Sequence, residues 1–164
     1  MNTRIKTITA AIAIAAIALL GLGANPALAN TADDLESRTA AILAAHPGGK
    51  EIAPGIISWN DGAVTLTLEG APISPRSVAS CATGQYCAWS NTSYTGTKLT
   101  FTACSSGGTS SSLALLGGHA RSTANARTSG HVDARAGSTT IYTMSAGTGN
   151  PSNGVTLTAL VCYT

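Results

Sequence analysis

Hydrophobic and polar positions near the start of the chain follow the period of a helix. Over residues 31–46, three apolar residues recur on one helical face: Leu35, Ile42 and Leu43. Thr31 and Asp34 have the spacing of a capping box, which satisfies free backbone N–H groups at a helix start. Pro47-Gly48-Gly49 ends the pattern. We therefore expect one short helix over residues 31–46.

The period then changes from that of a helix to that of a strand. Two short strands are predicted at 56–59 and 63–68, and in the second of them leucine and valine alternate with threonine. Asn60-Asp61-Gly62 separates the two strands, and an Asp-Gly step is a strong signal for a hairpin turn. The chain up to residue 76 is therefore expected to form a helix and a β-hairpin.

From residue 80 onward, strand formers and turn formers dominate the sequence. Clusters of glycine, serine and asparagine separate further short runs of strand formers, at 98–102, 139–143 and 155–163. This spacing is typical of a small all-β sandwich. Pro72, Pro75 and Arg76 mark a linker before it. We therefore divide the chain after the leader into residues 30–76 and 80–164.

An apolar quartet stands out within the serine-rich and glycine-rich stretch 105–118. It consists of Leu113-Ala114-Leu115-Leu116 and is followed by two glycines. The pattern favours a short buried strand, and the alternative is an exposed loop that a partner protein can contact.

Residues 1–29 have the pattern of a secretory signal peptide. Two basic residues precede an apolar stretch over 8–20, and Ala27-Leu28-Ala29 provides the small residues of a cleavage site. The apolar stretch is shorter than the roughly 20 residues that a membrane-spanning helix needs, and Pro26 interrupts a helix there. We expect cleavage after Ala29 and a secreted, extracellular protein.

Removal of this leader changes the charge of the chain. The full 164 residues carry nine Lys and Arg against seven Asp and Glu, for a net charge of +2. Two of the basic residues lie in the leader, so the remaining 135 residues have a net charge of zero. Charged residues make up only 10% of the sequence and aromatic residues 4%. Electrostatic binding to nucleic acid or to a membrane surface therefore has no support.

All four cysteines follow the leader: Cys81, Cys87, Cys104 and Cys162. An even number of cysteines in a small secreted domain indicates disulfides. The sequence contains no C-x-x-C pair, so the cysteines do not have the spacing of a zinc site. Three pairings are possible. The short interval between Cys81 and Cys87 favours a local bridge, which leaves Cys104 and Cys162 to close a long loop.

The block from Cys81 to Cys104, CATGQYCAWSNTSYTGTKLTFTAC, resembles the secreted bacterial peptidase inhibitor family 36. The matching features are a cysteine pair with an aromatic residue before its second member and an aromatic pair followed by a glycine: Tyr86, Trp89, Tyr94 and Gly96. The resemblance implies a βγ-crystallin-like Greek-key fold in which the rings of Trp89 and Tyr94 pack across a folded-over hairpin. It also implies that Ser122 forms hydrogen bonds back to that hairpin.

The chain departs from this family pattern in three places. A second Greek key is expected to have another aromatic residue after Tyr142, but residue 147 is glycine. No acidic pair near Gly118 and His119 matches the calcium site of many βγ-crystallins. The metalloprotease inhibitors of the family carry their reactive bond in a later loop with its own short disulfide, and no such cysteine pair follows Cys104. The reactive bond therefore transfers to no residue of this chain.

Catalytic patterns are weak throughout the sequence. No G-x-S-x-G or H-E-x-x-H pattern occurs. The nearest approach to a catalytic cluster is His119, His131 and Asp133, which we interpret as polar surface residues. The sequence therefore predicts a binding protein that is not an enzyme and that has no cofactor and no metal ion.

Two hypotheses for the function follow. In the first, a monomeric secreted inhibitor blocks an extracellular metalloprotease with a rigid loop, and the candidate loop carries Leu113, Leu115 and Leu116. In the second, the same fold serves as a structural or cell-surface interaction module that inhibits nothing. A third, weaker hypothesis is that residues 31–70 form a pro-segment that is removed near the linker at 72–76.

Overall fold

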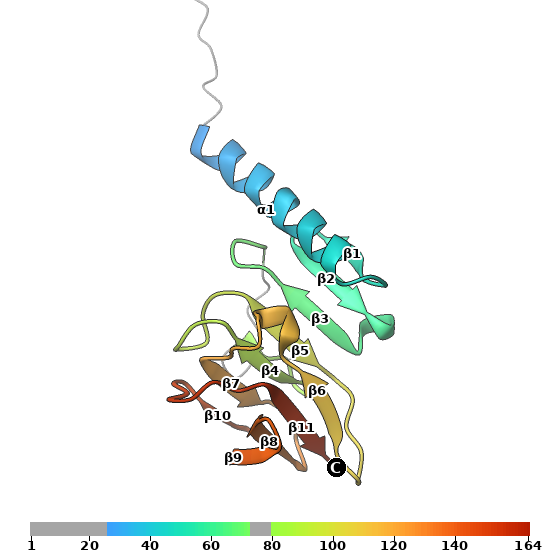
Figure 1. Ribbon diagram of the computed structural model, residues 1–164, viewed down its shortest axis with the longest axis vertical. Coiled ribbons are helices and arrows are strands. Elements are labelled where there is room, and N and C mark those ends of the chain that lie inside the picture. The colour runs from blue at the N-terminus through green and yellow to red at the C-terminus, as the bar shows by residue number, and fades with distance from the viewer. Residues whose placement is uncertain (1–25, 73–79) are drawn as a thin grey trace, which may run out of the picture.

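The structure is a computed structural model, and it describes residues 26–72 and 80–164. Over these residues, the elements are the α-helix α1 (Pro26–Ala45), two antiparallel β-sheets and short 3-10 helices that include η1 (Asn60–Gly62) and η3 (Ala114–Leu116) (Figure 1). Most of the predicted signal peptide and most of the predicted linker lie outside the described residues.

Helix α1 (Pro26–Ala45) begins five residues before the predicted start at Thr31. Proline is favoured in the first turn of a helix because backbone N–H groups there have no intrahelical acceptor, so that proline, which has no N–H, loses no hydrogen bond. Pro26 therefore opens the helix where we had expected it to interrupt one, and Thr31 lies inside the helix instead of capping it. The predicted apolar face is confirmed, since Leu35, Ile42 and Leu43 all pack against the core.

The larger sheet has seven strands and runs the length of the molecule. Its strands, in spatial order, are β1 (Lys50–Ala53), β2 (Ile56–Trp59), β3 (Val64–Thr67), β5 (Lys98–Phe101), β4 (Tyr86–Trp89), β7 (Ser122–Asn125) and β10 (Thr148–Asn150). The predicted hairpin is confirmed as β2 and β3, joined by the short 3-10 helix η1 (Asn60–Gly62). Strand β1 was not predicted from the sequence, and it is exposed along most of its length.

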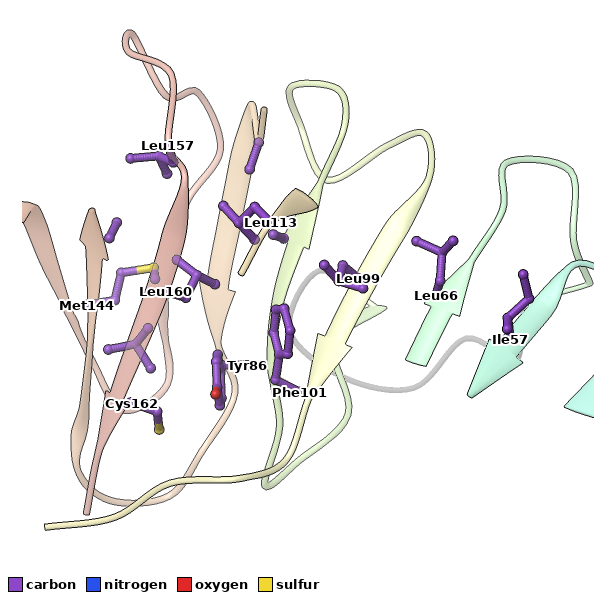
Figure 2. Packing of buried hydrophobic residues seen from close by; sticks show 14 of the residues in the cluster. Ile57, Leu66, Tyr86, Leu99, Phe101, Leu113, Met144, Leu157, Leu160 and Cys162 are labelled. Atoms are coloured by element: carbon purple, nitrogen blue, oxygen red, sulfur yellow. The ribbon is translucent and has the colours of Figure 1, made fainter. Parts of the chain in front are cut away.

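The smaller sheet has four strands and packs against part of the larger one. Its order is β6 (Thr109–Ser112), β11 (Ala159–Tyr163), β8 (His131–Ala136) and β9 (Thr139–Ser145). Figure 2 shows the shared core, in which Leu99 and Phe101 of the larger sheet lie near Leu160 of the smaller one. The prediction of a mainly β sandwich is therefore confirmed.

The strand order contains two Greek-key units that exchange one strand each. In the first, β4 pairs with β5 and β7 while β6 joins the opposite sheet. In the second, β8 pairs with β9 and β11 while β10 crosses to the larger sheet. The second unit forms although residue 147 is glycine, so its closure does not depend on a second aromatic pair. Each unit therefore contributes a strand to the core of the other.

The segment before residue 73 continues the sheet of the segment after residue 79. Strand β3 pairs with β5 in antiparallel register, with Val64 opposite Phe101 and Leu66 opposite Leu99. Leu66 and Leu99 are both fully buried in the same core. The boundary predicted between residues 76 and 80 thus separates two segments that share one sheet.

Replacing Leu66 with alanine is expected to destabilise the whole chain. The substitution leaves a cavity between β3 and β5, and such cavities cost about 2–5 kcal/mol of unfolding free energy. Urea unfolding followed by tryptophan fluorescence and by far-ultraviolet circular dichroism should show one shared transition at lower urea.

Ile52→Ala is the control, because Ile52 is 64% exposed, and it should leave the midpoint nearly unchanged. A separate early transition in Leu66→Ala, with the rest of the chain unaffected, would instead mean that residues 26–72 unfold independently, as a removable pro-segment requires.

Candidate functional site

The hairpin between β4 and β5 folds over an aromatic pair. The rings of Trp89 and Tyr94 meet edge to face with their centroids 5.2 Å apart, a favourable arrangement for two aromatic quadrupoles. Gly96 has φ of +80°, and a Cβ at this position would lie 2.4 Å from Ser90 Oγ. The turn therefore requires glycine both for its backbone conformation and for the close approach of Ser90.

Ser122 holds the folded-over hairpin from the neighbouring strand β7. Its hydroxyl donates to the carbonyl of Asn91 at 2.7 Å and accepts from the backbone N–H of Tyr94 at 3.0 Å. Ser122 is completely buried, so no water can replace these bonds. Its position and contacts are those that the family resemblance implies.

The two disulfides pair as the sequence spacing favours. Cys81–Cys87 closes the short loop before β4, and it packs in a small cluster with Trp89. Cys104–Cys162 joins the end of β5 to β11, and so connects the two sheets. The segment that leaves Cys104 is therefore covalently fixed at its base.

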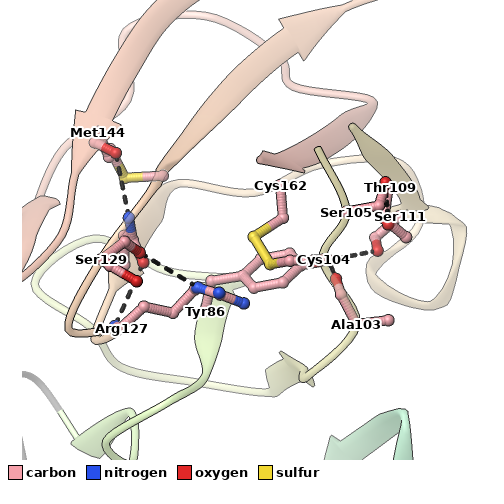
Figure 3. The surroundings of a disulfide bond; sticks show 11 residues. Tyr86, Ala103, Cys104, Ser105, Thr109, Ser111, Arg127, Ser129, Met144 and Cys162 are labelled. Carbon is pink, nitrogen blue, oxygen red and sulfur yellow. Dashed lines mark hydrogen bonds between the residues drawn. A yellow bond between two sulfur atoms is a disulfide. The ribbon is translucent and has the colours of Figure 1, made fainter. Parts of the chain in front are cut away.

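Tyr86 fixes the same segment from inside the core (Figure 3). Its ring stacks on Phe101 with centroids 5.2 Å apart, and its hydroxyl donates to the carbonyl of Ala103 at 2.9 Å. Because that bond uses the phenolic proton, Ser111 Oγ donates to the Tyr86 oxygen across 2.8 Å. Burial raises the pKa of Tyr86. The phenol thus joins the residue before Cys104 to strand β6.

The candidate loop at 105–118 divides into an exposed turn, a strand and a short 3-10 helix. Ser105, Ser106 and Gly107 are exposed, and Gly108 closes the turn with a hydrogen bond to the carbonyl of Ser105 at 3.1 Å. The backbone N–H of Thr164 also donates to that carbonyl at 3.2 Å. The exposed turn is therefore held by β11 as well as by the disulfide.

The apolar quartet is neither a strand nor an exposed loop. Leu113 precedes the 3-10 helix η3 (Ala114–Leu116) and is completely buried, so it cannot contact a partner protein. Leu115 and Leu116 are half-buried and pack against the core. The candidate contact residues are thereby reduced to Leu115, Leu116 and the exposed turn.

A groove lies beside this segment, between β6 and the end of α1. It encloses about 560 Å³, and Trp59, Val64 and Phe101 of the larger sheet contribute to its lining. Leu115 and His46 also belong to its lining. Apart from His46, none of the described residues that line it is ionisable. The groove is therefore nearly uncharged, and its lining combines apolar side chains of the larger sheet with the hydroxyl-bearing residues of β6.

The polar residues considered for catalysis do not form a site. The ring of His131 stacks on Tyr163 with centroids 4.6 Å apart, while Asp133 accepts hydrogen bonds from Thr143 at 2.6 Å and from Arg135 at 3.4 Å. His119 follows η3 in an exposed position. Over residues 26–72 and 80–164, no group of three His, Cys, Asp or Glu side chains could hold a metal ion. In the same ranges, no helix is long and apolar enough to span a membrane.

Comparison with protein-family models gives a match to peptidase inhibitor family I36 over residues 74–151. This match supports assigning residues 74–151 to peptidase inhibitor family I36. The matched range begins after β3 and includes β4 to β10, so the I36 segment contains both exchanged strands but not α1 or β1–β3. No curated protein and no solved structure matched the chain.

The groove was not predicted from the sequence. Its lining comes from η1 and β3 and, much later along the chain, from β5 and β6. Trp59 gives the one local signal, since an indole near a strand end in a protein with few aromatic residues is typical of a structural contact. Its Nε1 donates to the carbonyl of His46 at 3.2 Å and joins β2 to the end of α1.

Ser122→Ala is expected to lower the free energy of unfolding by about 1–3 kcal/mol. The N–H of Tyr94 and the carbonyl of Asn91 each lose a hydrogen-bond partner at a buried position, where water cannot replace it. Equilibrium urea unfolding measures the effect. Ser138→Ala, at an exposed turn position, is the control. Equal stability of the two variants would contradict a structural role for Ser122.

Tyr86→Phe is expected to cost about 1–3 kcal/mol near pH 8, because the carbonyl of Ala103 and the hydroxyl of Ser111 lose their partner. The pKa of Tyr86 is raised in the folded state, so its stabilising effect is complete below the ordinary phenol value of 10.0 and is lost as the pH rises above it. The stability difference between wild type and Tyr86→Phe should therefore shrink above pH 10. Urea unfolding at pH 8 and at pH 10.5 tests this, and a constant difference would contradict it.

Proposed function

We propose that this protein is a secreted inhibitor of an extracellular metalloprotease. The match to peptidase inhibitor family I36 supports a protease partner and a role other than catalysis. Two disulfides, which form and persist in oxidising compartments, support secretion.

The observation that carries the proposal is the exposed turn that directly follows Cys104. An inhibitor loses least entropy on binding when its contact loop is already rigid. The turn at 105–108 is held at its base by Cys104–Cys162, and from β11 by the bond of Thr164 to Ser105. Gly108 has φ of +85°, and a Cβ there would lie 2.6 Å from the ring of Tyr163. We infer that this turn and Leu115 form the protease contact.

The alternative is a structural or cell-surface interaction module with the same fold. It is favoured by one specific observation: Cys104 pairs with the distant Cys162, so no short disulfide closes a loop after Cys104. In that case the exposed turn and the groove would contact a partner that is not a protease.

An inhibition assay separates the two functions. The secreted protein should inhibit a thermolysin-type metalloprotease at micromolar concentration or below, and serine and cysteine proteases should serve as the comparison panel. Leu115→Asp and Ser106→Asp are each expected to weaken inhibition by about tenfold or more, as loss of a central interface contact does.

Ile141→Asp is the matched control. Ile141 is an exposed apolar residue on β9, which forms the edge of the smaller sheet opposite β6. Melting temperatures identify variants that fail to fold. Full potency in both folded variants would rule out this contact surface, and no inhibition of any protease by wild type would favour the interaction module.

A further inference from the structure

The larger sheet is longer than the smaller sheet that covers it, and this mismatch creates the groove. The smaller sheet covers the Greek-key part, while α1 covers the part formed by β1, β2 and β3 (Figure 1). Strand β6 is the edge of the smaller sheet on the side of α1. The groove is the space left between these two covers, and Val64 and Phe101 contribute to its apolar lining.

One edge of β6 is used and the other is open. The strand pairs with β11 in regular antiparallel register, with Ser111 opposite Leu160. In the same register, the backbone N–H of Leu113 donates to the carbonyl of Thr158 at 3.0 Å. Backbone groups alternate in direction along an antiparallel strand. Thr109 and Ser111 therefore point their N–H and C=O groups toward β11, whereas Ser110 and Ser112 point theirs away from it.

The backbone groups of Ser110 and Ser112 thus lie along the groove, of which both residues form part of the lining. Among the described residues, β6 forms backbone hydrogen bonds with β11 and with no strand on its other side. A free strand edge offers a row of hydrogen-bond donors and acceptors that an added strand can pair with. Apolar lining beside such an edge suits the alternate side chains of that strand.

We propose that this groove binds an extended, uncharged segment of a partner protein, which pairs with the open edge of β6 and places a bulky apolar side chain against Trp59 and Val64, two half-buried residues of the lining. The near absence of ionisable lining residues favours an uncharged segment, since a charged side chain would lose its water here without gaining an opposite charge. The inference does not depend on protease inhibition, because it concerns the edge of β6 and not the turn at 105–108.

A second copy of this chain is a poorer occupant of the groove. Pairing of β6 with β6 of another copy would bring serine side chains to the apolar part of the lining, and would leave Trp59 and Val64 without an apolar partner. Ala45 at the end of α1 and Leu115 also line the groove, and a space of about 560 Å³ suits a single strand better than a whole domain.

Nuclear magnetic resonance with a defined peptide tests the proposal. The probe is the uncharged peptide acetyl-Thr-Val-Phe-Val-Thr-amide, titrated into the isotope-labelled full-length secreted protein. The backbone amide signals of Ser110 and Ser112 and the indole N–H of Trp59 are expected to shift. The same peptide with N-methyl groups on its valine and phenylalanine residues cannot pair along a strand edge, and it should produce no shifts at these positions.

Two variants distinguish the backbone contact from the apolar contact. Ser110→Pro removes an N–H that faces the open edge and spares the bonds to β11, and Val64→Thr keeps the shape of the side chain but makes it polar. Each should weaken peptide binding by about tenfold. Val155→Thr, at a position that is 46% exposed and does not line the groove, should leave binding unchanged.

Three results would overturn the proposal. They are shifts confined to other surfaces, peptide binding by folded Val64→Thr and Ser110→Pro as tight as by wild type, and dimerisation of wild type that Ser110→Pro abolishes. The last result, measured by sedimentation, would assign the edge of β6 to a second copy of the chain. Because no protease is present, failure here leaves the inhibition assay unaffected.

Discussion

The pairing of β3 with β5 is the contact on which the rest of the architecture depends. It joins two segments of different sequence character into one sheet, and it places Leu66 directly opposite Leu99. Without this pairing, β5 would have an open edge, and α1 with β1–β3 would not be joined to the sheet of the Greek-key part. The groove also depends on this pairing, since Val64 reaches it from β3 and Phe101 from β5. A site at the junction of two segments therefore arises from a backbone ladder of four residues in each strand.

The sequence predicted those elements whose signals are local. The Asp-Gly turn and the alternating residues of 63–68 defined β2 and β3, and the aromatic pair with Gly96 defined the folded-over hairpin. The predicted start of α1 at Thr31 was wrong. Proline is unfavourable inside a helix but favourable in its first turn, and the sequence alone does not say which position Pro26 occupies. The prediction of a short strand for the apolar quartet 113–116 was wrong for a related reason. A run of apolar residues indicates burial, but it does not distinguish a strand from one turn of 3-10 helix. The groove and the joint between β3 and β5 involve long-range pairing, which no local pattern contains.

A core with few aromatic residues is completed by buried polar side chains that satisfy one another. Asn125 is fully buried, and its Nδ2 donates to the carbonyl of Met144 at 3.1 Å. Thr123, also buried, shares a hydrogen bond of 2.7 Å with the hydroxyl of Tyr142. Both bonds connect β7 of the larger sheet to β9 of the smaller one. Because each buried group has a partner, these residues avoid the desolvation cost that unpaired polar groups would bring. They also fix the relative position of the sheets, which apolar contacts alone define less strictly.

Strand β6 combines rigidity on one side with an open edge on the other. Its pairing with β11, the disulfide at Cys104 and the bond from Ser111 to Tyr86 all hold it from the side of the core. A strand held in this way has already lost the conformational entropy that pairing with another strand would otherwise require. The exposed turn that precedes β6 and the groove that runs beside it are therefore prepared for binding by the same few contacts. A change at Tyr86 or Cys104 would affect both surfaces together, whereas a change at Ser106 or Val64 would affect only one of them.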